Sequence, residues 1–167
     1  MLKVIKKEHI YNTELVWTGN LGDGTRNYKD YSRAHEISVE GKPIIVGSSD
    51  PNFNGDASRY NPEEMLVASL SSCHLLWYLH LCSQAKIIVV DYKDKANGKM
   101  IETAGGGGHF TEVVLKPRVL ITEESDIEKA NELHHKAHEL CFIANSVNFP
   151  VLCEAVISVK QFSVAAD

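Results

Sequence analysis

The longest apolar pattern in the chain runs from Asn61 to Cys82 and reads NPEEMLVASLSSCHLLWYLHLC. Asparagine is a favoured N-cap and proline is tolerated at the first helical position, so Asn61 and Pro62 predict the start of a helix. Glu63 and Glu64 follow at the positive end of the helix dipole, and Glu64 has the spacing of a capping box. Apolar residues then recur at helical spacing and also fill most of the remaining circumference. The pattern predicts a central helix that is buried on nearly all sides.

Shorter patterns flank this helix. A second helix is predicted from Asp126 to about Cys141, because Ser125 and Glu128 have capping-box spacing. Short apolar or alternating runs between turn residues predict strands over residues 4–9, 15–18, 31–39, 44–46, 87–92, 99–102, 110–121 and 151–164. The order is a β-rich N-terminal half, a long central helix, further strands, a second helix and a last strand. It predicts a single α+β domain over residues 1–167.

Composition narrows the classes of function. The chain has 167 residues, of which 44% are hydrophobic, enough for one sizeable core. Its net charge of -5 argues against nucleic-acid binding, which needs a basic face. No run reaches the roughly 18 consecutive apolar residues that predict a membrane helix, and the charged N-terminal segment does not resemble a signal peptide. We therefore expect a cytoplasmic protein whose cysteines are free, catalytic or metal-bound rather than paired in structural disulfides.

Cys73 is the first candidate for chemistry because it lies in the middle of the central helix. A cysteine in an apolar helix is most often a small hydrophobic residue. It lies about 18 Å from the helix N-terminus, beyond the reach of the dipole, so a reactive thiolate there needs a cation from elsewhere. Cys82 falls on the opposite face of the helix, and Cys153 shares a strand face with Val151, so both are expected in the core. Cys141, at the end of the second helix, is the cysteine best placed to pair with Cys73.

The cation would come from an arginine, and arginines are scarce in this chain. Arg33 lies on a predicted strand, and Arg59 ends the long turn-rich loop that leads into the central helix. Glu63 could orient a guanidinium group. Along one straight helix Glu63 and Cys73 lie about 15 Å apart. They can share a site only if two such helices from two chains pack antiparallel, and an apolar helix of this kind hints at such a dimer.

A metal site is an alternative. His134, His138 and Cys141 share one face of the second helix, with His135 beside them, and imidazole and thiolate at this spacing could hold zinc. No local motif supplies a fourth ligand, and the HExxH signature is absent. A solvent-facing histidine cluster is the simpler interpretation, so a zinc-binding module stays open as an alternative function.

The motifs NPEE, ASLSSC and AHELC together resemble the OsmC/Ohr family, the osmotically inducible protein C and organic hydroperoxide resistance proteins. The resemblance covers nearly the whole chain and is strongest over residues 60–82 and 130–151. It implies an OsmC-like fold and an intertwined homodimer in which the long central helices pack together. It also implies chemistry that uses no metal, flavin or other cofactor.

The activity implied by the resemblance is a thiol-dependent peroxidase that reduces organic hydroperoxides in oxidative-stress defence. Cys73 matches the peroxidatic cysteine and Cys141 the resolving cysteine. Glu63 matches the carboxylate that orients the activating arginine, for which Arg33 and Arg59 are favoured. An external dithiol, which the resemblance suggests is a lipoylated protein, would reduce the oxidised enzyme.

Two expectations complete the sequence reading. Apolar walls formed by Leu76, Trp77 and Phe142 would favour organic hydroperoxides over hydrogen peroxide. A non-catalytic OsmC-like dimer that binds a small apolar ligand through its interface is the second alternative function.

Overall fold

The structure, a computed structural model, describes residues 7–160 apart from the side chain of Ser125. The predicted central helix is α1 (Pro62–Gln84). The backbone N–H of Asn61 donates to Glu64 Oε2 at 3.2 Å, and the N–H of Glu64 donates to Asn61 Oδ1 at 2.8 Å. The predicted capping box is therefore confirmed, and it determines where α1 begins.

Burial of α1 differs from the prediction. Its buried side chains recur at every fourth position and form one stripe, made of Leu70, His74, Tyr78 and Cys82. Apolar residues on other faces remain accessible, and Leu76 is 65% exposed. The prediction that α1 is buried on nearly all sides is wrong for the single chain, because only the stripe faces the core of this chain.

Length and composition alone would allow α1 to cross a membrane, and among the described residues it is the one helix of this kind. One such helix is weak support for a membrane protein, because the core helix of a globular protein passes the same test. The expected cytoplasmic location stays a prediction.

The chain divides into two compact units, up to Glu64 and from Met65 onward, and each is described by itself. The first unit contains an antiparallel sheet of order β1-β2-β3 and a short 3-10 helix in the loop before α1. These elements are β1 (Glu14–Trp17), β2 (His35–Ser38), β3 (Ile45–Gly47) and η1 (Pro51–Phe53). The prediction of one domain over the whole chain stays a prediction.

Two predicted strands in the first unit need correction. The strand predicted over 31–39 is limited to β2, because residues 31–34 and 39 are not in a strand. Of the strand predicted over 4–9, residues 7–9 are not in a strand, and residues 4–6 lie outside the described residues.

The second unit contains two three-stranded sheets, of order β4-β7-β9 and β5-β6-β8. In each sheet the first pair of strands is antiparallel and the last strand joins in parallel. The strands are β4 (Val89–Asp94), β5 (Asn97–Glu102), β6 (Gly108–Leu115), β7 (Pro117–Ile121), β8 (Val151–Cys153) and β9 (Val156–Val159).

The two sheets of this unit are built from the same three stretches of chain. Each stretch gives one strand to one sheet and the next strand to the other sheet. The strands predicted over 110–121 and 151–164 are each divided in two, and residues 161–164 lie outside the described residues. At the interruption Asp94 Oδ1 accepts the backbone N–H of Lys116 at 2.7 Å, where a strand partner would otherwise accept it. The Asp94 side chain thus replaces one backbone hydrogen bond of the strand ladder. The strand-like sequence pattern therefore continues through this point, although the pairing changes from one sheet to the other.

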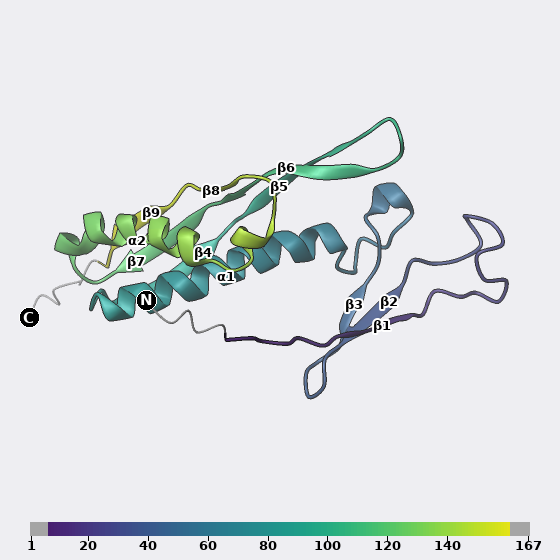
Figure 1. Cartoon of the computed structure of the whole chain (residues 1–167), viewed down its shortest axis with the longest axis horizontal. Helices are drawn as coiled ribbons and strands as arrows, with labels where there is room; N and C mark the ends of the chain where they lie inside the picture. Colours follow the sequence, from purple (N-terminus) through teal and green to yellow (C-terminus); the bar gives the residue numbers. More distant parts are fainter. Residues whose placement is uncertain (1–6, 161–167) are drawn as a thin grey trace, which may run out of the picture. The chain divides into compact units, whose positions relative to one another are not determined.

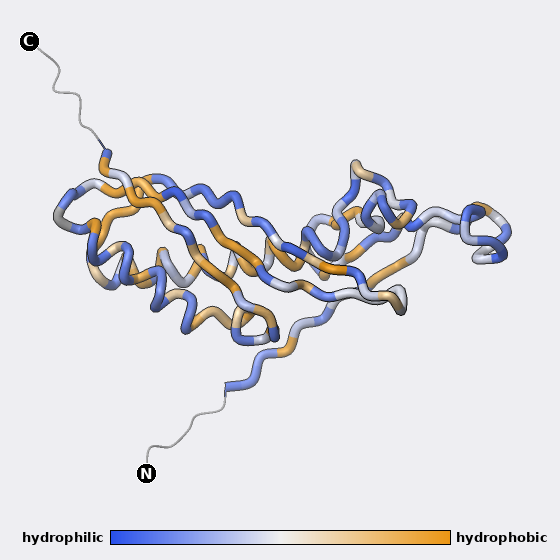
Figure 2. Tube along the Cα trace, turned by 90° about the horizontal axis from the view of Figure 1, so that it is seen from above, coloured by the Kyte–Doolittle hydropathy of each residue, from blue (hydrophilic) through white to orange (hydrophobic). Residues whose placement is uncertain are grey.

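The second predicted helix is α2 (Ile127–Leu140), between the short 3-10 helices η2 (Glu124–Asp126) and η3 (Ala144–Ser146). Its predicted capping box depends on the Ser125 side chain, which lies outside the described residues. Helices α1 and α2 lie along the same sheet (Figure 1), and side chains from α1, α2 and β7 share one buried cluster. Helices and strands both carry hydrophobic and hydrophilic residues along their length, as expected for elements with one face toward the core (Figure 2). The predicted α+β class is confirmed.

Candidate active site

Two cysteines from separate helices meet in the second unit. Cys73 lies on α1 and is half-buried, whereas Cys141 is the C-cap residue of α2 and is 1% exposed. The two thiols are electrostatic neighbours, since Cys73 raises the pKa of Cys141, and both are free. The structure therefore brings together the two cysteines that the sequence places on elements able to pack. Their catalytic roles stay predictions.

The end of α2 explains how Cys141 reaches this position. Its backbone leaves the helix in an extended conformation, with φ -66° and ψ 111°. The chain then turns back around the sulfur. The backbone N–H of Ala144 donates to Cys141 Sγ at 3.4 Å, and the N–H of Asn145 donates to the Cys141 carbonyl at 3.0 Å. The turn after α2 therefore holds the thiol in a fixed place.

Burial raises the pKa of Cys141 to about 11, and the hydrogen bond with Cys73 raises this pKa as well, while the backbone N–H of Ala144 acts in the opposite direction. A hydrogen bond raises the pKa of a thiol when it favours the protonated form. At pH 7 Cys141 is a neutral thiol.

Aromatic side chains flank the two cysteines. Trp77 lies one helical turn beyond Cys73, and Phe142 directly follows Cys141. Their rings pack edge to face with centroids 5.8 Å apart, and Phe142 is 70% exposed. Two of the three residues expected to form apolar walls are therefore in contact.

Arg33, one of the two arginines predicted to activate Cys73, belongs to the first unit. Its guanidinium group donates to the carbonyl of Tyr31 at 2.6 Å and to the carbonyl of Tyr28 at 2.7 Å. It also lies over both tyrosine rings, 4.3 Å and 4.2 Å from their centroids. These contacts hold Arg33 in one orientation within its unit.

Arg59 and Glu63 also lie in the first unit. Arg59 pairs with Asp56 at 3.5 Å. Within the described part of this unit, Glu63 is not paired with Arg59 or Arg33. The approach of these three side chains to Cys73 stays a prediction, as does the second chain on which it would depend.

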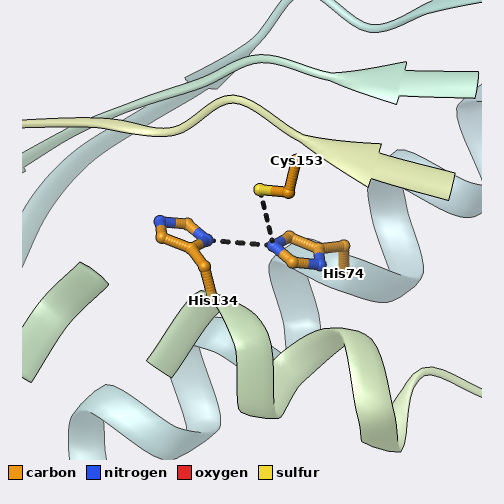
Figure 3. A group of neighbouring side chains, drawn as sticks. All are labelled: His74, His134 and Cys153. Carbon is orange, nitrogen blue, oxygen red and sulfur yellow. Dashed lines mark hydrogen bonds between the residues drawn. The ribbon is translucent and has the colours of Figure 1, made fainter. Parts of the chain in front are cut away.

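The zinc ligands expected on α2 are not brought together. Among the described residues, the group whose ligand atoms lie within 4.8 Å of one another is His74, His134 and Cys153, without His138 or Cys141 (Figure 3). His134 and Cys141 are both buried, 3% and 1% exposed, but they lie in different groups, and His138 belongs to neither. The prediction of His134, His138 and Cys141 as one ligand set is therefore wrong for this chain.

Sequence reasoning missed His74 and misjudged Cys153. His74 lies on the same stripe of α1 as Leu70 and Tyr78, so the helical spacing could have identified it as a buried polar residue. Cys153 was expected in the core. It is instead half-buried, and its Sγ lies 3.7 Å from His74 Nε2.

Comparisons with known proteins cover nearly all of the chain. A family model described as OsmC-like protein matches residues 55–155, a range that includes all four cysteines and both α-helices. A solved structure of an OsmC-like protein of unknown function from Vibrio cholerae O1 biovar eltor is 33% identical, with a TM-score of 0.80 over 89% of this chain and 100% of that chain.

More distant similarities extend over nearly the same length of chain. An organic hydroperoxide resistance protein from Elizabethkingia anophelis is 20% identical, with a TM-score of 0.65 over 92% of this chain and 100% of that chain. The uncharacterized protein YmaD of Bacillus subtilis is 22% identical over 158 residues, which make up 92% of this chain and 96% of its own length. At this identity the solved structure supports the fold alone.

Proposed function

Since the chain belongs to the OsmC-like family, we propose that it is a peroxidase that reduces organic hydroperoxides with Cys73 and Cys141. The observation that carries the proposal is that these two thiols, which come from α1 and from the end of α2, are close enough for Cys73 to raise the pKa of Cys141. Two neighbours of the same fold are named organic hydroperoxide resistance proteins. We assign the same activity to this chain as part of the proposal.

In the first step the Cys73 thiolate attacks the terminal oxygen of the hydroperoxide. An S–O bond forms and the O–O bond breaks. The departing alkoxide takes up a proton and leaves as an alcohol, and Cys73 becomes a sulfenic acid. The thiol is thereby oxidised and the peroxide reduced.

In the second step Cys141 condenses with the sulfenic acid. An S–S bond forms between Cys73 and Cys141, and the hydroxyl group of the sulfenic acid leaves with a proton as water. Cys141 supplies the proton as its sulfur attacks, so the departing hydroxyl leaves as water. An external dithiol, for which we propose a lipoylated protein, then reduces the disulfide by thiol–disulfide exchange.

The proposal includes a homodimer. The exposed apolar residues of α1, among them Leu76 and Leu79, support a second copy of the helix as their cover. Antiparallel packing of two such helices would bring Glu63 of one chain towards Cys73 of the other. Arg33 or Arg59, oriented by Glu63, would then stabilise the thiolate.

Single-turnover kinetics with an organic hydroperoxide and no reductant test the proposal. Cys73→Ser should lower the rate of peroxide consumption at least about a hundredfold, as removal of an attacking group does. Cys141→Ser should still form the sulfenic acid, which dimedone traps, but no intramolecular disulfide. Cys82→Ser, the same change elsewhere on α1, serves as the matched control and should react like the parent. An undiminished rate in folded Cys73→Ser protein would rule out the mechanism.

A further inference from the structure

A second group of reactive side chains lies apart from the Cys73–Cys141 pair. It consists of His74 from α1, His134 from α2 and Cys153 from β8, which point toward one another (Figure 3). His74 Nε2 lies 2.9 Å from His134 Nδ1 and 3.7 Å from Cys153 Sγ. His74 and His134 are only 1% and 3% exposed. Three elements of the second unit therefore converge on one buried point.

We propose that His74, His134 and Cys153 form a binding site for a zinc ion. Two imidazole nitrogens and a thiolate are ligands that zinc prefers. In a tetrahedral zinc site, two ligand nitrogens lie about 3.3 Å apart, and a nitrogen and a sulfur about 3.6 Å apart. The observed nitrogen–sulfur distance already fits, and the nitrogen pair would open by a few tenths of an ångström.

His74 and His134 are hydrogen-bonded to each other, but in the described part of the chain they do not belong to a network in which every ring nitrogen has a partner. His74 and His134 share one hydrogen bond, and their rings are parallel, with an interplanar angle of 1°. His134 Nε2 is buried and has no hydrogen-bond partner among the described residues. Nε2 is not the proposed ligand atom of His134, so the site is carried by the convergence of His74 Nε2, His134 Nδ1 and Cys153 Sγ.

The protonation states of the ligands support the same reading. Burial lowers the pKa of His74 to about 4 and that of His134 to about 3. Both imidazoles are therefore neutral at pH 7, the form that binds metal. Burial also raises the pKa of Cys153 to about 11, so an incoming ion must displace the thiol proton, as zinc does when it binds cysteine.

A cavity borders two of the three ligands, His134 and Cys153. It has a volume of about 470 Å³, and its walls include His134 and Cys153 together with His135, His138 and Glu154. This space would admit an ion and leave room for water or a further side chain as the fourth ligand. Three protein ligands and one open position are the arrangement of many zinc sites that are not purely structural.

The position of the site has a consequence for the cysteine pair. His74 directly follows Cys73 on α1, and His134 lies on α2, the helix that ends beside Cys141. An ion bound to the three ligands would join α1, α2 and β8. It would stabilise the packing of the elements that bring the two redox candidates together.

Metal titration tests the proposal on untagged full-length protein carrying Cys73→Ser and Cys141→Ser. This background removes the other close thiol pair, so the result does not depend on the proposed peroxidase activity. Zinc, measured by competition with a chromophoric chelator, should bind at about one ion per chain. Cobalt in place of zinc should give a tetrahedral spectrum with a thiolate-to-metal charge-transfer band. Absence of zinc binding, or a cobalt spectrum without that band, would overturn the proposal.

Matched variants locate the ligands. Cys153→Ser and His74→Asn should each weaken zinc binding at least about a hundredfold, more than the loss of a supporting group does. Cys82→Ser and His80→Asn make the same changes elsewhere on α1 and should leave the affinity unchanged. Circular dichroism checks that each variant is folded. Parental affinity in both ligand variants would disprove the assignment.

Alkylation of the unsubstituted protein provides a test that needs no variant. Zinc should slow the labelling of Cys153 by iodoacetamide, followed by peptide mass spectrometry, at least about tenfold, because the coordinated thiolate is no longer free to react. Labelling of Cys82 should not change. Equal labelling of Cys153 with and without zinc would count against the site.

Discussion

Cys73 and His74, two neighbouring residues of α1, each have a different cysteine beside them, and the two arrangements suit different kinds of sulfur chemistry. Cys73 contacts Cys141, a second thiol held by the turn after α2. His74, the next residue, contacts His134 and the thiol of Cys153. Both partner thiols, Cys141 and Cys153, have a pKa raised to about 11, and burial is the main cause in each case.

Burial alone therefore does not distinguish the two sites. The neighbours do. A thiol beside another thiol can form a disulfide, whereas a thiol beside two neutral imidazoles offers ligands to a metal. The comparison teaches that the chemistry of a buried cysteine is decided by the groups within hydrogen-bond distance and not by the size of its pKa shift.

The largest expected effect separates the two sites completely. Cys73→Ser should lose peroxide reduction at least about a hundredfold and keep zinc affinity, since His74 and Cys153 remain in place. Cys153→Ser should lose zinc affinity by a similar factor and keep the rate of peroxide consumption. Stopped-flow kinetics and zinc titration on the same preparations measure both quantities. If either variant loses both activities while folded, the two sites are not independent.

The sequence predicts α1 and α2 well, because these depend on local signals. Asn61 and Glu64 form the capping box that their spacing predicts. Cys141 reaches Cys73 because α2 ends where its pattern ends. Each of these features is set by residues within a few positions of one another or by one helix packing on the other.

The features that the sequence did not predict depend on contacts between distant elements. His134 has the same spacing from His138 whether its ring faces solvent or the core, so the helix pattern alone suggested a surface zinc set. Contacts with His74 on α1 and with Tyr78 one turn further hold the His134 ring in the core. The interruption of the long strands has a similar origin, since Asp94 meets the backbone of Lys116 across the sheet. No local motif marks such a contact.

A second prediction concerns acid stability. Burial lowers the pKa of His74 and His134 to about 4 and about 3, with small opposing or additional effects of Asp94, His135 and His138. The unfolded chain binds protons at these histidines below about pH 6.5, whereas the folded chain does so only near pH 4 and 3. The free energy of unfolding should therefore fall, by about a few kcal/mol in total, between pH 6.5 and pH 4.

Urea unfolding at several pH values measures this slope on metal-free protein. Cys141 should add nothing in this range, because it is protonated throughout. His134→Asn should flatten the pH dependence, and His80→Asn, an exposed histidine on α1, should leave it as in the parent. A parental slope in His134→Asn would show that the acid sensitivity has another source.

A third prediction concerns the selectivity of the cysteine pair. Phe142 is largely exposed and packs against Trp77, so Phe142→Ala should cost little stability. Loss of this apolar surface should lower kcat/KM for cumene hydroperoxide about tenfold, the usual scale for a hydrophobic contact of this size. The value for hydrogen peroxide, which has no apolar group, should change much less and serves as the internal control. Equal losses with both peroxides would contradict an apolar substrate wall.

The smallest expected effect tests how far the two sites are insulated from each other. Asp94 raises the pKa of both His74 and Cys153 through its charge, and its Oδ1 accepts the N–H of Lys116. Asp94→Asn keeps that hydrogen-bond acceptor but removes the charge, so the sheet should stay intact. Loss of a supporting carboxylate should weaken zinc binding about tenfold, because the negative charge stabilises the bound cation. The rate of peroxide consumption at Cys73 should not change. If the rate falls with the zinc affinity, Asp94 couples the two sites, and the chemistry of each cysteine depends on more than its nearest neighbours.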